Sequence, residues 1–119
     1  MAYTHDGKKP VTSKNDPIDP DGTDWEFFHY DDWLRAGETI IAHESSITGG
    51  TIVTDSTYLG TMTADDGVEY DQTYGVEFSV ATGATSVTLT HRVSTSTVGA
   101  VDLGRTDIDH SVIIPVKTL

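Results

Sequence analysis

Two neighbouring segments in which apolar and polar residues alternate constrain the fold most. Every second residue in 74–80 is apolar, and 87–93 repeats the pattern with one histidine among the apolar positions. A period of two places alternate side chains on one face of a strand, so both segments are predicted to be β-strands, separated by a break at Gly83. The inward-facing set is Tyr74, Val76, Phe78, Val80, Val87, Leu89, His91 and Val93. His91 is therefore predicted to be a hydrogen-bonded residue of the core or of an interface.

The remainder of the chain from residue 37 onward also favours strands. Threonine occurs 19 times, whereas lysine occurs four times and glutamine once, which favours pleated sheets over helices. Gly49-Gly50 and Asp66-Gly67 are typical of hairpin turns, and Pro115 favours an edge position for the last strand. The strands are expected at 38–44, 51–54, 57–63, 74–80, 87–93 and 111–116, with 94–106 as a long loop or partial strand. About seven strands at this spacing predict an all-β fold, an immunoglobulin-like β-sandwich.

The stretch 16–40 contains both tryptophans and two of the three phenylalanines. Large aromatic side chains bury the most area per residue, so this stretch is expected to anchor the core. Its end is predicted to form a short helical turn before the first strand, with Asp31 or Asp32 as the cap and Gly37 as a left-handed stop. We expect a structural plug at one end of the sandwich, formed by Trp25, Phe28, Trp33, Leu34 and Gly37.

Residues 1–24 show no hydrophobic period and are interrupted by prolines and glycines. Such a composition predicts an extended N-terminal arm for attachment, with the sandwich domain comprising residues 25–119. The arm residues expected to contact a partner are Tyr3, His5, Lys8, Lys9, Pro10, Val11, Lys14, Pro17 and Ile18.

The net charge of −12 is unevenly distributed along the chain. Residues 1–15 carry three lysines and one aspartate, whereas the remaining residues carry four basic and 18 acidic side chains. An acidic body repels nucleic acids and anionic membranes, so neither is expected as a partner. Cysteine is absent, which excludes disulfides and thiolate chemistry.

Two acidic clusters and five histidines are candidate metal ligands. One cluster consists of Asp19, Asp21, Asp24 and Glu26, and another of Asp65, Asp66, Glu69 and Asp71. Calcium prefers such carboxylates, but neither glycine nor glutamate stands where an EF-hand loop beginning at Asp19 needs it, and aspartate-rich turns also form without a metal. The five histidines lack the short spacings of a local zinc site. No cofactor is expected, and calcium is kept as the alternative.

No catalytic motif is present: the chain lacks a nucleophile elbow, a phosphate-binding glycine loop and a cysteine nucleophile. We therefore do not expect an enzyme. A carbohydrate-binding sandwich is a more credible alternative, because aromatic rings next to aspartates suit sugars. Tyr58, Tyr70 and Tyr74 are the candidates, although core packing explains them equally well.

Asp19-Pro20-Asp21, followed by Asp31-Asp32-Trp33-Leu34-Arg35-Ala36-Gly37-Glu38-Thr39-Ile40, resembles a family of small tailed-phage proteins encoded among the head and tail morphogenesis genes. In that family, Asp-Pro-Asp precedes Asp-Trp-x-Asp-Trp-Leu-x-x-Gly-Asp/Glu-Thr-Ile, and a threonine-rich β-sandwich follows. Here His29-Tyr30 stands in place of the first Asp-Trp, and Glu38 stands where aspartate is usual. The motif covers about a fifth of the chain.

The resemblance implies a virion structural protein without catalytic residues. The favoured expectation is a capsid decoration or cement protein, made in the host cytoplasm and attached by its arm to the major capsid protein on the capsid exterior. The alternatives are a neck or tail adaptor bound to another virion protein, and a carbohydrate-binding or adhesin Ig-like module. Self-association, for example as a trimer, is compatible with any of these roles.

Overall fold

The computed structural model describes residues 10–12, 17–20, 22–96 and 103–117. These residues form seven β-strands and no helix, so the predicted all-β class is confirmed. The strands are β1 (Val11–Thr12), β2 (Thr23–His29), β3 (Ile40–Thr48), β4 (Gly50–Thr63), β5 (Glu69–Val80), β6 (Ser86–Thr95) and β7 (Ile108–Pro115). The described part of the chain contains no helix that is long and apolar enough to span a membrane.

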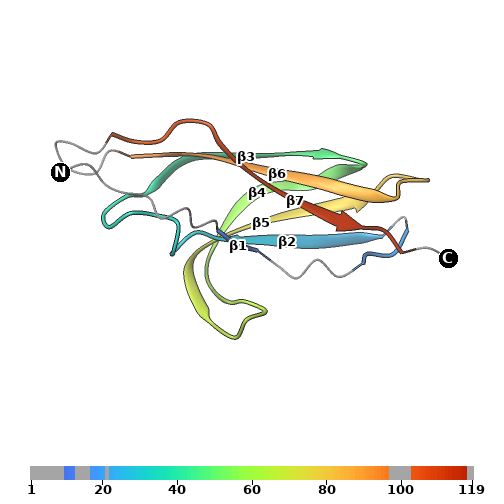
Figure 1. The fold of residues 1–119 in the computed structure, drawn as a ribbon, viewed down its shortest axis with the longest axis horizontal. Helices are drawn as coiled ribbons and strands as arrows, with labels where there is room; N and C mark the ends of the chain where they lie inside the picture. The colour runs from blue at the N-terminus through green and yellow to red at the C-terminus, as the bar shows by residue number, and fades with distance from the viewer. Residues whose placement is uncertain (1–9, 13–16, 21, 97–102, 118–119) are drawn as a thin grey trace.

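The strands form two antiparallel sheets that pack face to face. One sheet has the order β1-β2-β5-β4 and the other the order β3-β6-β7. Figure 1 shows β3 and β6 in the upper layer, β2 and β5 in the lower layer, and the far end of the β4–β5 hairpin bending away from the body. The two layers together are compatible with a β-sandwich.

The predicted alternation is confirmed in β5 and β6. The inward residues of both strands are buried, and they form one core with residues from β2 and β7 and from the segments beside them. Val76, Val87 and Leu89 are fully buried, whereas Arg92 on the opposite face of β6 is exposed. Each buried aliphatic side chain contributes roughly 1.5–3 kcal/mol, so these two strands hold the layers together.

Three predicted local features agree with the structure. Asp66-Gly67 lies in the turn of the β4–β5 hairpin, where Ala64 N donates to Val68 O at 2.9 Å. Pro115 ends β7, which is an edge strand of its sheet. Gly37 adopts a left-handed conformation with φ of 81°, which glycine reaches without steric cost.

The connections differ from the prediction at two places. Gly49-Gly50 does not close a hairpin, because β3 pairs with β6 in one sheet and β4 pairs with β5 in the other. The segments 51–54 and 57–63, predicted as separate strands, form the single strand β4, whose register shifts several times along β5.

The stretch before the predicted turn is itself a strand. β2 lies between β1 and β5, so the turn at 30–34 precedes the third strand and not the first. Leu34 N donates to Tyr30 O at 2.9 Å, the spacing of one helical turn. Asp31 does not cap this turn through its side chain, because its carboxylate accepts from the backbone of Asp71 and Gln72 on β5.

Candidate functional site

The described part of the N-terminal segment is built into the sandwich and touches both sheets. Val11 and Thr12 pair with His29 and Phe28 of β2. Farther along, Ile18 N donates to Pro115 O at 3.0 Å, so the segment crosses from one sheet to the end of the other. Because backbone bonds hold it at two points, this segment is continuous with the fold.

The predicted arm residues fall into two groups, those that the structure describes and those that lie outside the described residues. Pro10 and Ile18 are buried, Val11 is half-buried and Pro17 is exposed. Ile18 belongs to the hydrophobic core and is a residue of the domain. The expected boundary between residues 24 and 25 falls inside β2, which begins at Thr23. The other arm residues, Tyr3, His5, Lys8, Lys9 and Lys14, lie outside the described residues.

A cavity of about 180 Å³ opens between this segment and the edge strand β7. Its lining consists of Pro10, Thr12, Phe28, Asp109, His110, Ser111 and Val112. Phe28 and Val112 contribute apolar lining, and Asp109 and Ser111 contribute polar lining.

The predicted plug residues occupy different faces. Phe28 and Trp33 are buried in the core, and Leu34 packs against it. Trp25 lies on the opposite face of β2, outside the core, where its ring is within 5° of parallel to that of Phe27. Strand geometry explains the separation, because residues 25 and 28 differ by an odd number of positions.

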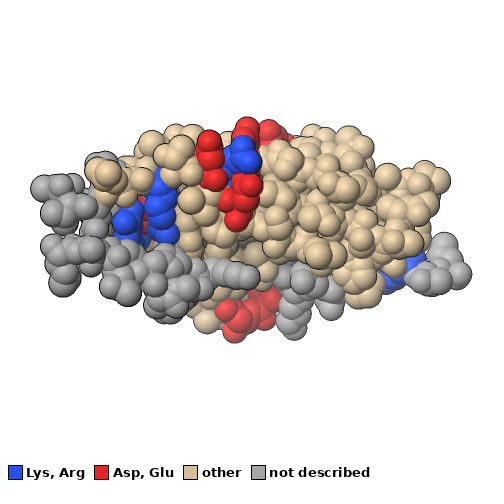
Figure 2. All heavy atoms as spheres, turned by 45° about the horizontal axis from the view of Figure 1, so that its top comes forward, with Lys and Arg blue, Asp and Glu red and all other residues tan. Residues whose placement is uncertain are grey.

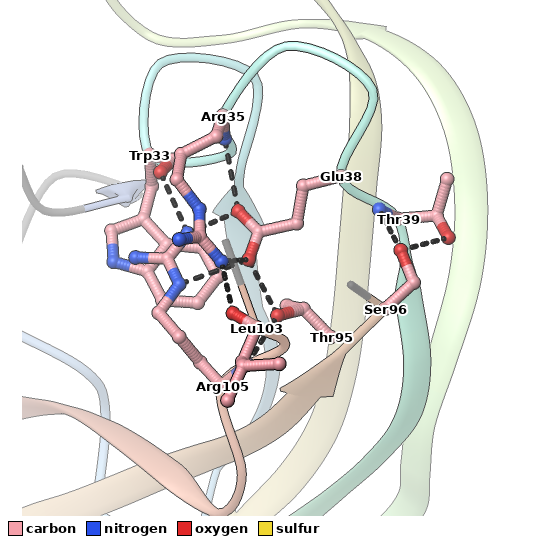
Figure 3. A network of polar contacts seen from close by, with 8 residues as sticks. All are labelled: Trp33, Arg35, Glu38, Thr39, Thr95, Ser96, Leu103 and Arg105. Carbon is pink, nitrogen blue, oxygen red and sulfur yellow. Dashed lines mark hydrogen bonds and ion pairs between the residues drawn. The ribbon is translucent and has the colours of Figure 1, made fainter. Parts of the chain in front are cut away.

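Next to Trp33, a charged network joins the β2–β3 connection to the segment before β7. Figure 3 shows the Glu38 carboxylate between Arg35 and Arg105. Arg35 Nη2 donates to Glu38 Oε2 at 2.8 Å, and Arg105 Nε donates to the same oxygen at 3.0 Å. The Glu38 side chain is fully buried. We call Arg35, Glu38, Arg105 and Thr95 the lock.

Two opposing effects set the protonation of Glu38. Burial by itself raises the pKa of a carboxyl group, but hydrogen bonds from Arg105, Arg35 and Thr95 outweigh it and lower the pKa of Glu38 to about 2. Glu38 is therefore ionised at neutral pH. The Arg105 guanidinium also lies 3.6 Å from the centre of the Trp33 ring, a cation–π contact that links Trp33 to the lock.

A second network, of hydrogen bonds, runs between the two sheets. Tyr30 OH lies 2.6 Å from His91 Nδ1 and 3.2 Å from His110 Nδ1. On the other side of His91, its Nε2 lies 2.5 Å from Ser56 Oγ, which in turn lies 2.6 Å from His43 Nδ1. We call His43, Ser56, His91, Tyr30 and His110 the relay. The predicted role of His91 as a hydrogen-bonded core residue is confirmed, since its side chain is fully buried.

Burial governs the protonation of the relay's centre. It lowers the pKa of His91 to about 3, and the nearby His43 and His110 lower it further. Burial also raises the pKa of Tyr30 far above its usual value. Both groups are therefore neutral at physiological pH, and the relay carries hydrogen bonds rather than ion pairs.

Members of the acidic clusters serve different local roles, and Asp66 stabilises a turn. Asp66 accepts from Val68 N at 2.9 Å and from Tyr70 OH at 2.8 Å, and Asp71 accepts from Thr61. Glu26 is buried on the inward face of β2 while Asp24 is exposed, and Asp21 lies outside the described residues. Within the described ranges, no group of three or more acidic or histidine side chains is placed to hold a metal ion.

The three tyrosines considered for sugar binding do not share an exposed surface. Tyr74 is a core residue and Tyr70 is buried against His29, with ring centres 4.9 Å apart. Tyr58 is 52% exposed. The sequence did not single out Phe27, which provides an outward-facing ring beside Trp25.

Sequence reasoning also missed the lock and most of the relay. Their members are far apart in the chain: Glu38 and Arg105 are 67 positions apart, and Tyr30 and His110 are 80 positions apart. The only local signal was the short spacing of Arg35 and Glu38, which suits an i,i+3 ion pair. Comparison with protein-family models, with curated proteins and with solved structures found no match to this chain.

Proposed function

We propose that this chain is a non-enzymatic structural protein of a tailed-phage virion, a decoration or cement protein bound to the capsid through its N-terminal region. This proposal is supported by the position of the residues of the phage-like motif, which help to build the domain. Trp33 packs in the core, and Glu38 forms an ion pair with Arg35 in the lock. Gly37, with its left-handed conformation, turns the chain between Arg35 and Glu38. Because these residues serve to fold the domain, we expect its functional contacts to lie elsewhere on its surface.

The strand order supports an immunoglobulin-like identity for the sandwich. Sheets ordered β1-β2-β5-β4 and β3-β6-β7 correspond to the ABED and CFG sheets of a constant-type immunoglobulin domain. The second contact of the N-terminal segment, at Ile18 and Val116, is parallel and joins the first part of the fold to the last. Such domains act as modules that display their edges and loops to partners.

The charge distribution fits attachment at one end. Each basic side chain that the structure describes, namely Arg35, Arg92, Arg105 and Lys117, forms an ion pair with a carboxylate. Figure 2 shows acidic and basic side chains in contact near the middle of one face, with other residues covering most of the described surface. The remaining carboxylates make the domain acidic, which favours solvation over self-association, whereas the first 15 residues are basic. Binding through the basic end directs the acidic domain outward.

Capsid binding can be tested with phage heads produced without this protein. The full chain is expected to sediment with such heads and to cover the whole head in electron micrographs after gold labelling. A chain lacking residues 1–9 is expected to keep its thermal transition and to lose binding. This truncation is preferable to removal of residues 1–24, because Ile18 and the start of β2 belong to the domain. Failure of the full chain to bind heads would overturn the proposal.

Gold at a single vertex would instead support the adaptor alternative, in which the chain joins the neck or tail. The oligomeric state of the free and bound chain distinguishes a monomeric clamp from a trimer. Light scattering of the free chain is the direct measurement.

A carbohydrate-binding module is the second candidate, on the strength of the outward rings of β2. Trp25 and Phe27 lie 6.2 Å apart between ring centres and are nearly parallel, an arrangement that can stack against a sugar. Glycan-array hits that are lost in Trp25→Ala would favour this candidate. An array without hits would remove it.

A further inference from the structure

The relay is a continuous series of four hydrogen bonds that crosses the sandwich from edge to edge. It begins at His43 on β3, passes through Ser56 on β4 and His91 on β6, and ends through Tyr30 at His110 on β7. His43 is exposed and His110 is partly exposed, whereas Tyr30 and His91 are fully buried. Tyr30 and His91 therefore have no direct contact with water, whereas both ends of the relay do.

The number of hydrogens in the relay restricts the direction of its bonds. Each hydroxyl group has one hydrogen to donate, and a neutral imidazole carries one N–H and one acceptor nitrogen. If His43 donates to Ser56, then Ser56 donates to His91 Nε2, His91 Nδ1 donates to Tyr30, and Tyr30 donates to His110. The reverse series, starting with donation from His110, satisfies all four bonds equally well. Mixed directions leave two donors or two acceptors facing each other.

We propose that the relay makes a proton on His43 or on His110 weaken proton binding at the other end, and so couples the β3–β4 side of the sandwich to the β7 edge. A protonated imidazole donates from both nitrogens and cannot accept a bond. Protonation of His43 selects the first direction, in which His110 must accept. Protonation of His110 selects the reverse direction, in which His43 must accept.

Protonation of both ends breaks the relay at its centre. Ser56 and Tyr30 then both donate towards His91, which has only one acceptor nitrogen. Accepting on both sides would require His91 to lose its last proton. Losing a buried hydrogen bond is costly, so the second end takes up its proton less readily than the first.

Charged and titratable groups surround both ends of the relay. Among the described residues, His43 is near Asp55 on β4 and packs against Tyr74 on β5 at 4.8 Å between ring centres. His110 packs against Trp33 at 4.8 Å and is next to Asp109, which Arg92 holds at 2.7 Å.

The position of the β7 end gives this coupling a structural consequence. His110 lines the cavity between β7 and the N-terminal segment, together with Pro10 and Thr12. A proton taken up at His43, on the far side of the sandwich, thus fixes the hydrogen-bonding state of a residue beside the N-terminal segment.

The coupling can be measured by a histidine-ring NMR titration of the full-length chain. Ser56→Ala interrupts the relay between His43 and His91. In this variant, the terminal histidine that is protonated second is expected to gain about tenfold in proton affinity, because its protonation no longer costs a buried hydrogen bond. Thr54→Ala is the matched control, because this hydroxyl lies on the same strand but donates to Glu77. Unchanged titration curves in Ser56→Ala would overturn the proposal, and through-space repulsion alone predicts that outcome.

The tautomer of His91 provides a second measurement that a general loss of stability does not imitate. His43→Gln and His110→Gln each leave one terminal histidine. Once that histidine is protonated, ring nitrogen shifts are expected to place the His91 proton on Nε2 in His43→Gln and on Nδ1 in His110→Gln. The same tautomer in both variants would contradict the relay.

Discussion

The lock and the relay are both buried polar networks that join distant parts of the chain, but they differ in charge. The lock holds an ionised carboxylate between two guanidinium groups, with Glu38 as the shared acceptor. The relay is centred on His91 and Tyr30, which are both neutral. A buried charge is stable only while its partners remain, whereas a neutral group loses a single hydrogen bond. The two networks should therefore respond very differently to mutation and to acid.

The largest effect is expected from Glu38→Ala. Removing the carboxylate leaves Arg35 and Arg105 close together without their common counter-charge, and breaking such a buried pair costs about 3–5 kcal/mol. Urea unfolding of the purified variant measures this loss. An unchanged free energy of unfolding would mean that water replaces the carboxylate in the lock.

Acid should destabilise the relay before it reaches the lock. The folded-state pKa of His91 is about 3, below its unfolded value of 6.5, so the unfolded chain binds the extra proton first. This contribution is complete above pH 6.5 and decreases as pH falls towards 3, by about 1.4 kcal/mol per pH unit and thus about 3 kcal/mol by pH 4. Urea unfolding between pH 7 and pH 4 measures it.

The variant His91→Gln separates this effect from that of other histidines. Burial also lowers the pKa of His29, which adds a loss in the same direction. The slope of stability against pH should be shallower in His91→Gln than in the wild type. For the lock, the pKa of Glu38 is lowered from 4.5 to about 2, so its contribution is present above pH 4.5 and is lost only between those values.

A smaller effect is expected from Tyr30→Phe, which keeps the ring in the core and removes only the hydroxyl. His91 Nδ1 loses its partner, and an unsatisfied buried polar group costs about 1–3 kcal/mol. The comparison with Glu38→Ala then tests whether the neutral network is the weaker one. Equal losses in the two variants would show that charge does not distinguish them.

The smallest effect is expected from Asp109→Ala. The Arg92–Asp109 pair has two well-placed hydrogen bonds, but both side chains are exposed to solvent, which screens their attraction. The thermal transition of this variant should stay close to that of the wild type. A large decrease would place this surface pair among the structural networks.

The predictable parts of the fold were those in which one face of a strand decides the pattern. In β5 and β6, one face meets the core and the other does not, so the buried Val76 is apolar and its neighbour Glu77 is charged. β2 escaped prediction because both of its faces carry large rings, Phe28 inward and Trp25 outward, and its sequence therefore does not alternate. Gly49-Gly50 was misjudged because a turn motif does not state which sheet the next strand joins.

The sequence by itself determined the all-β class, the inward faces of β5 and β6, the turn at Asp66-Gly67 and the inward position of His91, because each depends on neighbours a few residues away. Only the tertiary structure decided which strands share a sheet, that Ile18 belongs to the core, and that Glu38 meets Arg105. These features depend on contacts between residues far apart in the chain. Such contacts depend on the packing of the whole domain, so they cannot be predicted from local propensity.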